Sequence, residues 1–334
     1  MLLASTGWAI SDLEPASILV YPYFNSDADN GYASLITVTN VNPLQVYDPD
    51  TDTLEGDVFV KFYYVNATDC DITDRDTYLT PADTITVLAS DHNPATDQGW
   101  LYVVAMDPWS KLFGIKHDGQ ILIAPPDIFF NSGLIGDIMI ANGLTNHLWS
   151  IPAIGIKAKG KVVGELADKN KNRILEFGTE YEGLPSTLFI SSFLEMGIGA
   201  GKFNSNAYLI LLTFLPVEYT VFMDFLFYNN DEEEFSQEFQ FNCYFNDLMT
   251  EVFASADNIT GPTGKSNHYD EDAVVQTLWA SMRVEKARAF GDTLPWNCVP
   301  ILGAILQTIF DTHYQSARLL HHSCDEYVSG ELEY

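Results

Sequence analysis

The sequence predicts a mainly β protein built from two tandem, duplicated antiparallel β-sandwiches of immunoglobulin-like or jelly-roll-like type, with a small amount of helix. Three observations favour this class: an internal repeat of aromatic segments, many short stretches rich in β-branched and aromatic residues, and Asn-, Asp- and Gly-rich turns between them. Short strands at this spacing are typical of sandwiches rather than of a wound parallel sheet. A chain of 334 residues suits about two domains.

The repeat pairs residues 58–66 with residues 221–229. Four residues match in order without a gap, namely Val58, Phe59, Phe62 and Asn66 with Val221, Phe222, Phe225 and Asn229. Residues 33–39 precede the first copy and residues 207–213 the second, and acidic residues follow both: Asp69, Asp71, Asp74 and Asp76 in one, Asp231–Glu234 in the other. We interpret this as duplication of one unit (strand, loop, aromatic strand, acidic turn). The alternative is coincidence among similar apolar strands.

Strands are expected, in order, at residues 18–24, 35–39, 58–65, 78–88, 100–106, 121–124 and 135–141. Pro22 in the first of these suits an edge strand. The character then changes, because many of the chain's few lysines fall between residues 157 and 171. We therefore assign residues 10–150 to the first sandwich, 151–202 to a connector or insertion, and 203–334 to the second sandwich.

Two late segments fit either a helix or a strand. Residues 270–288 start acidic and end basic, as a helix aligned with its own macrodipole would, and they place apolar residues at helical spacing. A strand over residues 274–282 is the competing interpretation. Residues 299–310 are equally ambiguous, since Pro300 and Gly303 weaken a helix there.

The charge of the chain limits its partners. Sixteen basic against 46 acidic residues give a formal net charge of −30, which repels nucleic-acid phosphates and anionic membrane surfaces. Bound cations or a basic partner would relieve the self-repulsion, although solubility alone also explains such a charge. The longest apolar run, residues 207–228, is interrupted by Pro216, Glu218 and Asp224, so no membrane span is expected.

The N-terminus and the cysteines indicate an extracellular or cell-surface location. Residues 1–9 are interpreted as the remnant of a secretory signal, because Gly7 and Ala9 are small residues at the spacing of a signal-peptidase site. An ordinary apolar extension is the alternative. Four cysteines without a Cys-x-x-Cys spacing predict two disulfides, at least one of them within the C-terminal half. These cysteines are Cys70, Cys243, Cys298 and Cys324.

A calcium loop is the best candidate site. Asp168, Asn170 and Asn172 reproduce positions 1, 3 and 5 of a calcium loop, where oxygen ligands alternate along the chain. Arg173 and Thr179 depart from the pattern, standing where a Gly and a bidentate Glu are usual. The expected ligands of Ca²⁺ are Asp168, Asn170, Asn172, Ile174, Glu176 and Glu180. A solvated polar turn is the alternative.

A second cation site is expected at the acidic rim of the first sandwich, formed by Asp48, Asp50, Asp52, Glu55 and Asp57. A flexible, solvated loop is the alternative. Residues 197–202 fail the phosphate-loop pattern, and His321, His322 and Cys324 form only half of a zinc set. Neither Gly-x-Ser-x-Gly nor His-Glu-x-x-His occurs, so the commonest hydrolase signatures are absent and no catalytic residue is assigned.

The favoured function is a secreted or cell-surface structural protein that self-assembles into a filament, surface layer or matrix, with calcium offsetting charge at the contacts. Its expected partner is itself, as a homo-oligomer or polymer. The alternative is an extracellular adhesin module that binds carbohydrate or protein, since the 17 Tyr and 6 Trp include groups suited to a glycan or surface partner. A hydrolase that uses carboxylates or a metal ranks third, and the chain is not expected to be an enzyme.

Overall fold

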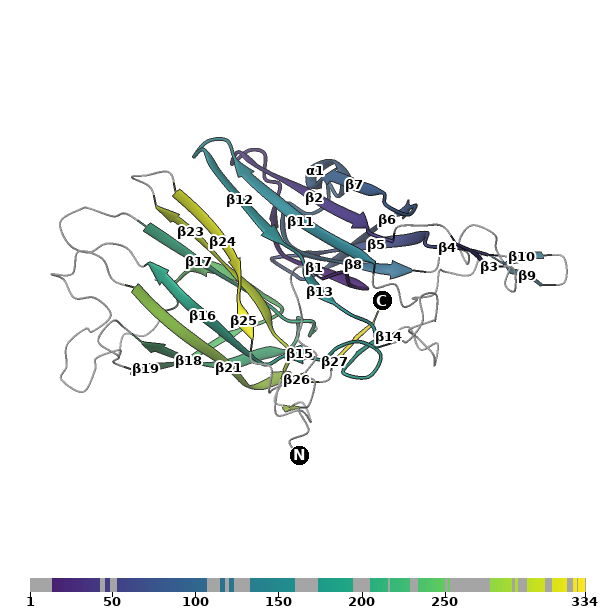
Figure 1. The fold of residues 1–334 in the computed structure, drawn as a ribbon. Coiled ribbons are helices and arrows are strands. Elements are labelled where there is room, and N and C mark those ends of the chain that lie inside the picture. The colour runs from purple at the N-terminus through teal and green to yellow at the C-terminus, as the bar shows by residue number, and fades with distance from the viewer. Residues whose placement is uncertain are drawn as a thin grey trace, which may run out of the picture.

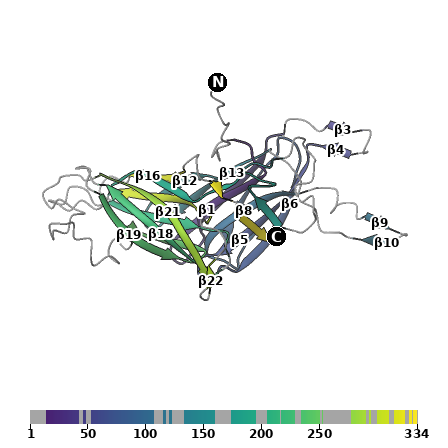
Figure 2. The same ribbon diagram turned by 90° about the horizontal axis from the view of Figure 1, so that it is seen from below.

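The structure, a computed structural model, describes residues 14–42, 46–48, 53–106, 115–117, 120–122, 133–159, 174–194, 205–215, 217–228, 234–249, 252, 277–289, 292–293, 299–309, 314–322, 327–328 and 330–333. These residues are mainly β, as predicted, and the short helix α1 spans Ala89–His92. No helix among them is long and apolar enough to cross a membrane. Two antiparallel sandwiches lie side by side (Figures 1 and 2).

The N-terminal sandwich packs a five-stranded sheet against a four-stranded one. Sheet 1a has the order β13-β1-β8-β5-β6, and sheet 1b has the order β12-β11-β2-β7. The strands of sheet 1a are β1 (Ile18–Asn25), β5 (Val58–Asn66), β6 (Ile72–Leu79), β8 (Gln98–Met106) and β13 (Ile154–Ile156). Those of sheet 1b are β2 (Tyr32–Asn40), β7 (Thr84–Leu88), β11 (Leu134–Asn142) and β12 (His147–Pro152).

The C-terminal sandwich has the same plan. Sheet 2a has the order β25-β16-β21-β18-β19, with β22 (Asp292–Thr293) paired beside β21, and sheet 2b has the order β24-β23-β17-β20. The strands of sheet 2a are β16 (Thr187–Leu194), β18 (Thr220–Tyr228), β19 (Glu234–Phe241), β21 (Thr277–Ala289) and β25 (His321–His322). Those of sheet 2b are β17 (Ser205–Leu212), β20 (Tyr244–Leu248), β23 (Leu302–Ile309) and β24 (Tyr314–Leu319).

Four short ladders complete the described strands. The hairpins β3 (Val46–Asp48)–β4 (Thr53–Glu55) and β9 (Ile115–His117)–β10 (Gln120–Leu122) extend from the side of the N-terminal sandwich that faces away from the C-terminal one (Figures 1 and 2). The ladders β14 (Ile174–Phe177)–β27 (Gly330–Glu333) and β15 (Leu184–Pro185)–β26 (Tyr327–Val328) join the linker to the end of the chain.

The two sandwiches share strand register as well as strand order. In β1 and β8, Tyr21 pairs with Leu101 and the register then shifts before Phe24; in β16 and β21, Ile190 pairs with Ala280 and the register shifts before Phe193. A β-bulge at the same place in two sheets is a specific feature, because bulges locally re-aim the chain. The shared register supports the predicted duplication, while common ancestry itself stays an inference.

The aromatic repeat found in the sequence occupies equivalent strands. Val58, Val60, Phe62 and Tyr64 of β5 point into the N-terminal core, and Val221, Met223, Phe225 and Phe227 of β18 point into the C-terminal core at the matching positions. The predicted match of the flanking strands is wrong by one residue. Ile36 faces the core of its own sandwich, whereas Ile210 faces the other sandwich; the true counterpart of Ile36 is Leu209. A one-residue shift in a strand exchanges its two faces.

Two glycines hold the same position in the two sandwiches. A Cβ on Gly136 would lie 2.0 Å from the Tyr21 hydroxyl and 2.5 Å from the Thr37 carbonyl oxygen, and a Cβ on Gly303 would lie 2.4 Å from the Ile210 carbonyl oxygen. In each copy the glycine carbonyl also accepts a backbone hydrogen bond from the strand beyond the turn. Tight backbone approach therefore requires glycine at both positions.

Several predicted boundaries change. Residues 78–88 are two strands, because the turn at residues 80–83 contains Ala82 in the left-handed region at φ 58°. Both ambiguous late segments contain strands, β21 and β23. In β21 the alternation of buried and exposed residues outweighs the acidic-to-basic gradient, and the described residues of β23 are buried on both faces. The segment 151–202 contributes β13 to the first sandwich and β16 to the second, so the linker between them lies within residues 157–186.

Replacing Gly136 or Gly303 by Ala should lower the free energy of unfolding by about 1–3 kcal/mol, because the added methyl group must displace backbone atoms. Gly143→Ala is the matched control, since the nearest atom to its Cβ would lie 3.9 Å away. Chemical denaturation of the three variants tests this expectation. Equal stability of all three would contradict the tight approach described above.

Candidate functional site: the junction between the two sandwiches

The central strands β1, β5 and β8 of sheet 1a are buried on both faces, which is unusual for a sheet of a sandwich. One face contributes to the core between sheets 1a and 1b. The opposite, outer face carries Phe59, Tyr63, Trp100 and Tyr102, all at most 6% exposed, in a second apolar cluster. Aromatic residues at these outward positions need a partner, and the linker and the C-terminal sandwich supply it.

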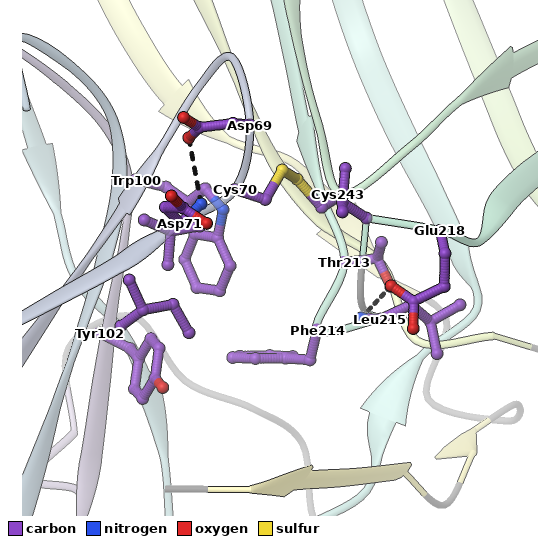
Figure 3. A pocket seen from close by; sticks show the side chains of 13 residues that line it. Asp69, Cys70, Asp71, Trp100, Tyr102, Thr213, Phe214, Leu215, Glu218 and Cys243 are labelled. Atoms are coloured by element: carbon purple, nitrogen blue, oxygen red, sulfur yellow. Dashed lines mark hydrogen bonds between the residues drawn. A yellow bond between two sulfur atoms is a disulfide. The ribbon is translucent and has the colours of Figure 1, made fainter.

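The cover of this outer face centres on Phe214, which follows β17 of the C-terminal sandwich. Its ring lies 5.2 Å from Trp100, 5.9 Å from Tyr102 and 5.1 Å from Phe177 of β14, measured between ring centroids. Figure 3 shows the Phe214 ring directed toward Trp100 and Tyr102. The contacts with Trp100 and Tyr102 are edge-on, and such aromatic pairs each contribute about 0.5–1.5 kcal/mol beyond the buried area.

Sheet 2b buries its outer face against the same sandwich. Ile210, Ala304 and Leu306 are at most 3% exposed and belong to the core cluster of the N-terminal sandwich. They close the side of that sandwich between β1 and β12, because β13 pairs only with the first residues of β1. The N-terminal core is therefore completed by the C-terminal sandwich.

Polar and covalent contacts fix the same junction. The Gln315 side chain of β24 donates a hydrogen bond to the Asn146 carbonyl oxygen at 3.2 Å and accepts one from the Leu148 amide. Cys70, in the turn after β5, forms a disulfide with Cys243 before β20, with their Cα atoms 6.5 Å apart. The bond links the two halves (Figure 3). This bond differs from the disulfide that was predicted within the C-terminal half. Cys298 and Cys324, the other two cysteines, lie outside the described residues, so their pairing stays a prediction.

Two pockets flank the junction. The disulfide pocket, of about 320 Å³, lies beside Cys70 and Cys243 and is lined by Trp100, Tyr102 and Phe214 among others. The amide pocket, of about 470 Å³, is lined by Tyr23, Asn25, Asp27, Asn30, Tyr32, Gln98, Asn142, Trp149, Tyr208, Asn246 and Leu306. Both sandwiches contribute to each pocket.

The titratable groups of the junction favour contact over acid–base chemistry. Burial raises the pKa of Tyr102 and of Tyr63, so both hydroxyls stay protonated at neutral pH. The Tyr63 and Tyr102 hydroxyls and the Trp100 indole nitrogen are buried, and none has a hydrogen-bond partner among the described residues. Their large apolar rings make the site suited to packing.

The acidic rim expected to hold a cation is only partly described. Asp57 is 6% exposed and accepts a hydrogen bond from the Tyr78 hydroxyl, which gives this carboxylate a structural contact. Asp48 ends β3 and Glu55 ends β4, with Asp48 opposite Thr53 and Glu55 opposite Val46 across the hairpin. Asp50 and Asp52 lie outside the described residues. Calcium at this rim stays a prediction.

The calcium loop is likewise only partly described. Asp168, Asn170 and Asn172 fall in the segment 160–173, outside the described residues. Ile174 begins β14, Glu176 pairs with Glu331 of β27, and the Glu180 amide donates a hydrogen bond to the Glu176 carbonyl oxygen. Within the described part of the chain, no three His, Cys, Asp or Glu side chains gather as a metal site would require.

Comparisons with known proteins leave the fold and the junction as the basis for function. The fold and the junction define the class as a two-sandwich β protein whose halves are joined by an aromatic, disulfide-linked junction. No protein-family model matches the chain, and no curated protein matches its sequence.

Two junction features escaped the sequence reasoning. The first is the equivalence of Ser17 and Ser186, whose backbone carbonyls accept hydrogen bonds from Ala105 and Val284 of the neighbouring strands at matching positions. The second is the pair Trp100 and Trp279: Trp100 lies opposite Val65 in β5, and Trp279 lies opposite Tyr228, the residue equivalent to Val65 in β18. Comparing the two copies strand by strand would have found both.

The equivalent faces on the other sheets are open. Trp279 is 41% exposed and stacks on Tyr228 with ring centroids 3.9 Å apart, whereas Trp100 is 2% exposed. On sheet 1b, Leu35 and Met139 are each 40% exposed, whereas their counterparts on sheet 2b, Tyr208 and Leu306, face the junction. Each half of the junction therefore has an exposed counterpart elsewhere on the molecule.

Removing the disulfide with Cys70→Ala and Cys243→Ala should lower the free energy of unfolding by about 2–5 kcal/mol, because a bond that closes a long loop restricts the unfolded chain. Denaturation of the double variant beside the unaltered protein measures this loss. Non-reducing peptide mapping provides the control. A free Cys70 thiol, or Cys70 bonded to another cysteine, would contradict the link between the halves.

Proposed function

We propose that this protein is an extracellular structural subunit that assembles head to tail, with copies joined through contacts like those between its own two sandwiches. The observation that supports the proposal is the exposed counterpart of each half of the junction. Sheet 1b of one copy would take the place that sheet 2b takes within the chain. Sheet 2a of the next copy would take the place of sheet 1a.

The two faces fit this role in composition. The outward positions of sheet 1b carry Ala, Leu, Ile, Met, Thr, Ser and Pro, and Asp137 is the charged residue among them. In a chain of net charge −30, a nearly neutral face is where a second copy meets the least repulsion. The outward positions of sheet 2a include Trp279, Tyr228 and Leu226, with Asp224 between Arg283 and Glu238, and with Glu234 accepting a hydrogen bond from the Tyr228 hydroxyl.

Faces suit assembly better than sheet edges do. The edge strand β6 exposes Asp74, Arg75 and Asp76, and the edge strand β19 exposes Glu234 and Glu238. Charged residues on an edge strand oppose pairing with a strand of another chain. Face-to-face docking is therefore the mode we propose, in place of the strand recruitment that the sequence suggested.

The symmetry of such a contact has a consequence for the assembly. A contact between two different faces is heterologous, and it generates a ring if the rotation closes or a filament if it does not. Sheet 1b lies at the upper right of Figure 1 and sheet 2a at the lower left, so one copy can use both faces at once.

Variants on either face should block assembly. The double variant Leu35→Glu, Met139→Glu places two charges on sheet 1b, and Trp279→Glu places one charge on sheet 2a. Burying an unpaired charge in a contact weakens the binding free energy by several kcal/mol. Sedimentation velocity and negative-stain microscopy should show large species for the unaltered protein and single copies for each variant. Ile72→Glu, at a position 49% exposed outside both faces, is the control and should still assemble.

Mixing the two kinds of variant tests the geometry. The sheet 1b variant retains an intact sheet 2a, and the Trp279 variant retains an intact sheet 1b, so an equal mixture should form pairs and stop there. Two copies joined through the same face would give no such complementation. Unaltered protein that stays monomeric at every concentration, with and without calcium, would rule out the proposal.

Calcium should promote the assembly if it offsets the acidic charge, as the sequence suggested. The elution volume in size-exclusion chromatography should shift toward larger species in calcium and return in chelator, at constant ionic strength. Magnesium at the same concentration is the control for simple screening. An equal effect of the two ions would assign the shift to charge screening and remove the specific calcium site from the proposal.

A further inference from the structure

We propose that the amide pocket is a binding site for a neutral, polyhydroxylated ligand such as a short saccharide, held between the two sandwiches. Its volume of about 470 Å³ falls in the usual range for small-molecule sites, roughly 300–1,000 Å³. The pocket lies at the junction, but its ligand would need no second copy of the chain. The inference is therefore independent of the proposed assembly.

The aromatic part of the lining suits the apolar face of a sugar ring. Tyr23 and Tyr32 come from the N-terminal sandwich, Trp149 comes from β12, and Tyr208 comes from β17 of the C-terminal sandwich. Carbon-bound hydrogens of a sugar ring pack on aromatic faces of this kind. Burial raises the pKa of Tyr23, so its hydroxyl keeps its proton.

The polar part of the lining consists of side-chain amides, which donate and accept hydrogen bonds as sugar hydroxyls do. Asn25 donates from Nδ2 to the Tyr23 hydroxyl at 3.1 Å, and Asn246 also lies beside that hydroxyl. Gln98 contributes a further amide, and its side chain makes no hydrogen bond to the described residues. The amides come from both sandwiches.

The charge of the pocket excludes an anionic ligand. Asp27 is the charged residue of its lining, and Asn30 already donates to both carboxylate oxygens, from its backbone N–H at 3.1 Å and from Nδ2 at 2.6 Å. These hydrogen bonds lower the pKa of Asp27. With a fixed negative charge and without a basic side chain among its lining residues, the pocket favours a neutral ligand.

The observation that points to a ligand is the Trp149 indole nitrogen. Trp149 is 5% exposed, and its Nε1–H is buried without a hydrogen-bond partner among the described residues. A buried donor without a partner costs about 1–3 kcal/mol, so native proteins rarely retain one without a reason. Trp149 lines the pocket, so a ligand hydroxyl that displaces the atoms covering this N–H and accepts its hydrogen bond would remove that cost.

The test begins with fluorescently labelled full-length protein on an array of neutral and acidic glycans. Neutral glycans should bind, and the best soluble oligosaccharide is then titrated by calorimetry. Trp149→Phe keeps the ring and removes the N–H, and Gln98→Ala removes an amide that holds no contact in the fold. Each should weaken binding about tenfold, equivalent to about 1.4 kcal/mol. Trp279→Phe makes the same exchange outside the pocket and should leave the affinity unchanged.

Three results would overturn the inference. They are an array on which no neutral glycan binds, binding restricted to sialylated or sulfated glycans, and affinity unchanged in both Trp149→Phe and Gln98→Ala. Circular dichroism and the unfolding midpoint of each variant show whether the fold is intact. Because the Gln98 side chain makes no hydrogen bond within the described part of the chain, Gln98→Ala keeps the test decisive if Trp149→Phe proves unstable.

Discussion

Burial of the central strands of sheet 1a on both faces is the constraint on which the rest of the structure depends. A sandwich sheet ordinarily keeps polar residues on its outer face, where it meets water. Sheet 1a instead presents Trp100 and Tyr102 outward, and these rings must be covered. The cover comes from Phe214 and from the linker, so residues of both sandwiches share one apolar cluster. The Cys70–Cys243 disulfide links the same two sandwiches covalently beside this apolar contact.

Equivalent positions in the two sandwiches differ in exposure, and that difference carries the functional argument. Strand order and register are shared, yet Trp100 is 2% exposed and Trp279 is 41% exposed. When two domains of the same architecture pack against each other through different faces, each domain keeps, outside that contact, a face equivalent to the one that its partner uses. Whether such a face can bind a partner depends on its residues, and here Leu35, Met139 and Trp279 are apolar although each is at least 40% exposed. Exposed apolar residues grouped on one face generally mark contact surfaces.

The sequence predicted the fold class and the aromatic repeat because inward positions of β5 and β18 keep similar residues at a period of two. The sequence matched Ile36 with Ile210 instead of Leu209. Both faces of β17 are apolar, so alternation of apolar and polar residues cannot show which face is turned toward the core of its own sandwich. The charge gradient of residues 270–288 suggested a helix, although the charges belong to the exposed side of a strand, as Arg283 does between buried Met282 and Val284. The junction could not be predicted from the sequence. Cysteine spacing alone leaves the pairing of the cysteines open, and nothing in the sequence distinguishes Phe214 from the aromatic residues of the sandwich cores.

The distribution of charge connects the fold to its proposed roles. Acidic residues lie on the edge strands β6 and β19, where they oppose indiscriminate pairing between sheets, and they are sparse on the outer face of sheet 1b. Specificity therefore rests on which faces are left neutral. The amide pocket adds a second consequence, because its lining comes from both sandwiches. A ligand that binds there stabilises the docked arrangement over any opened one by its own binding free energy. Ligand binding and the integrity of the junction are thus thermodynamically linked, whichever partner the outer faces meet.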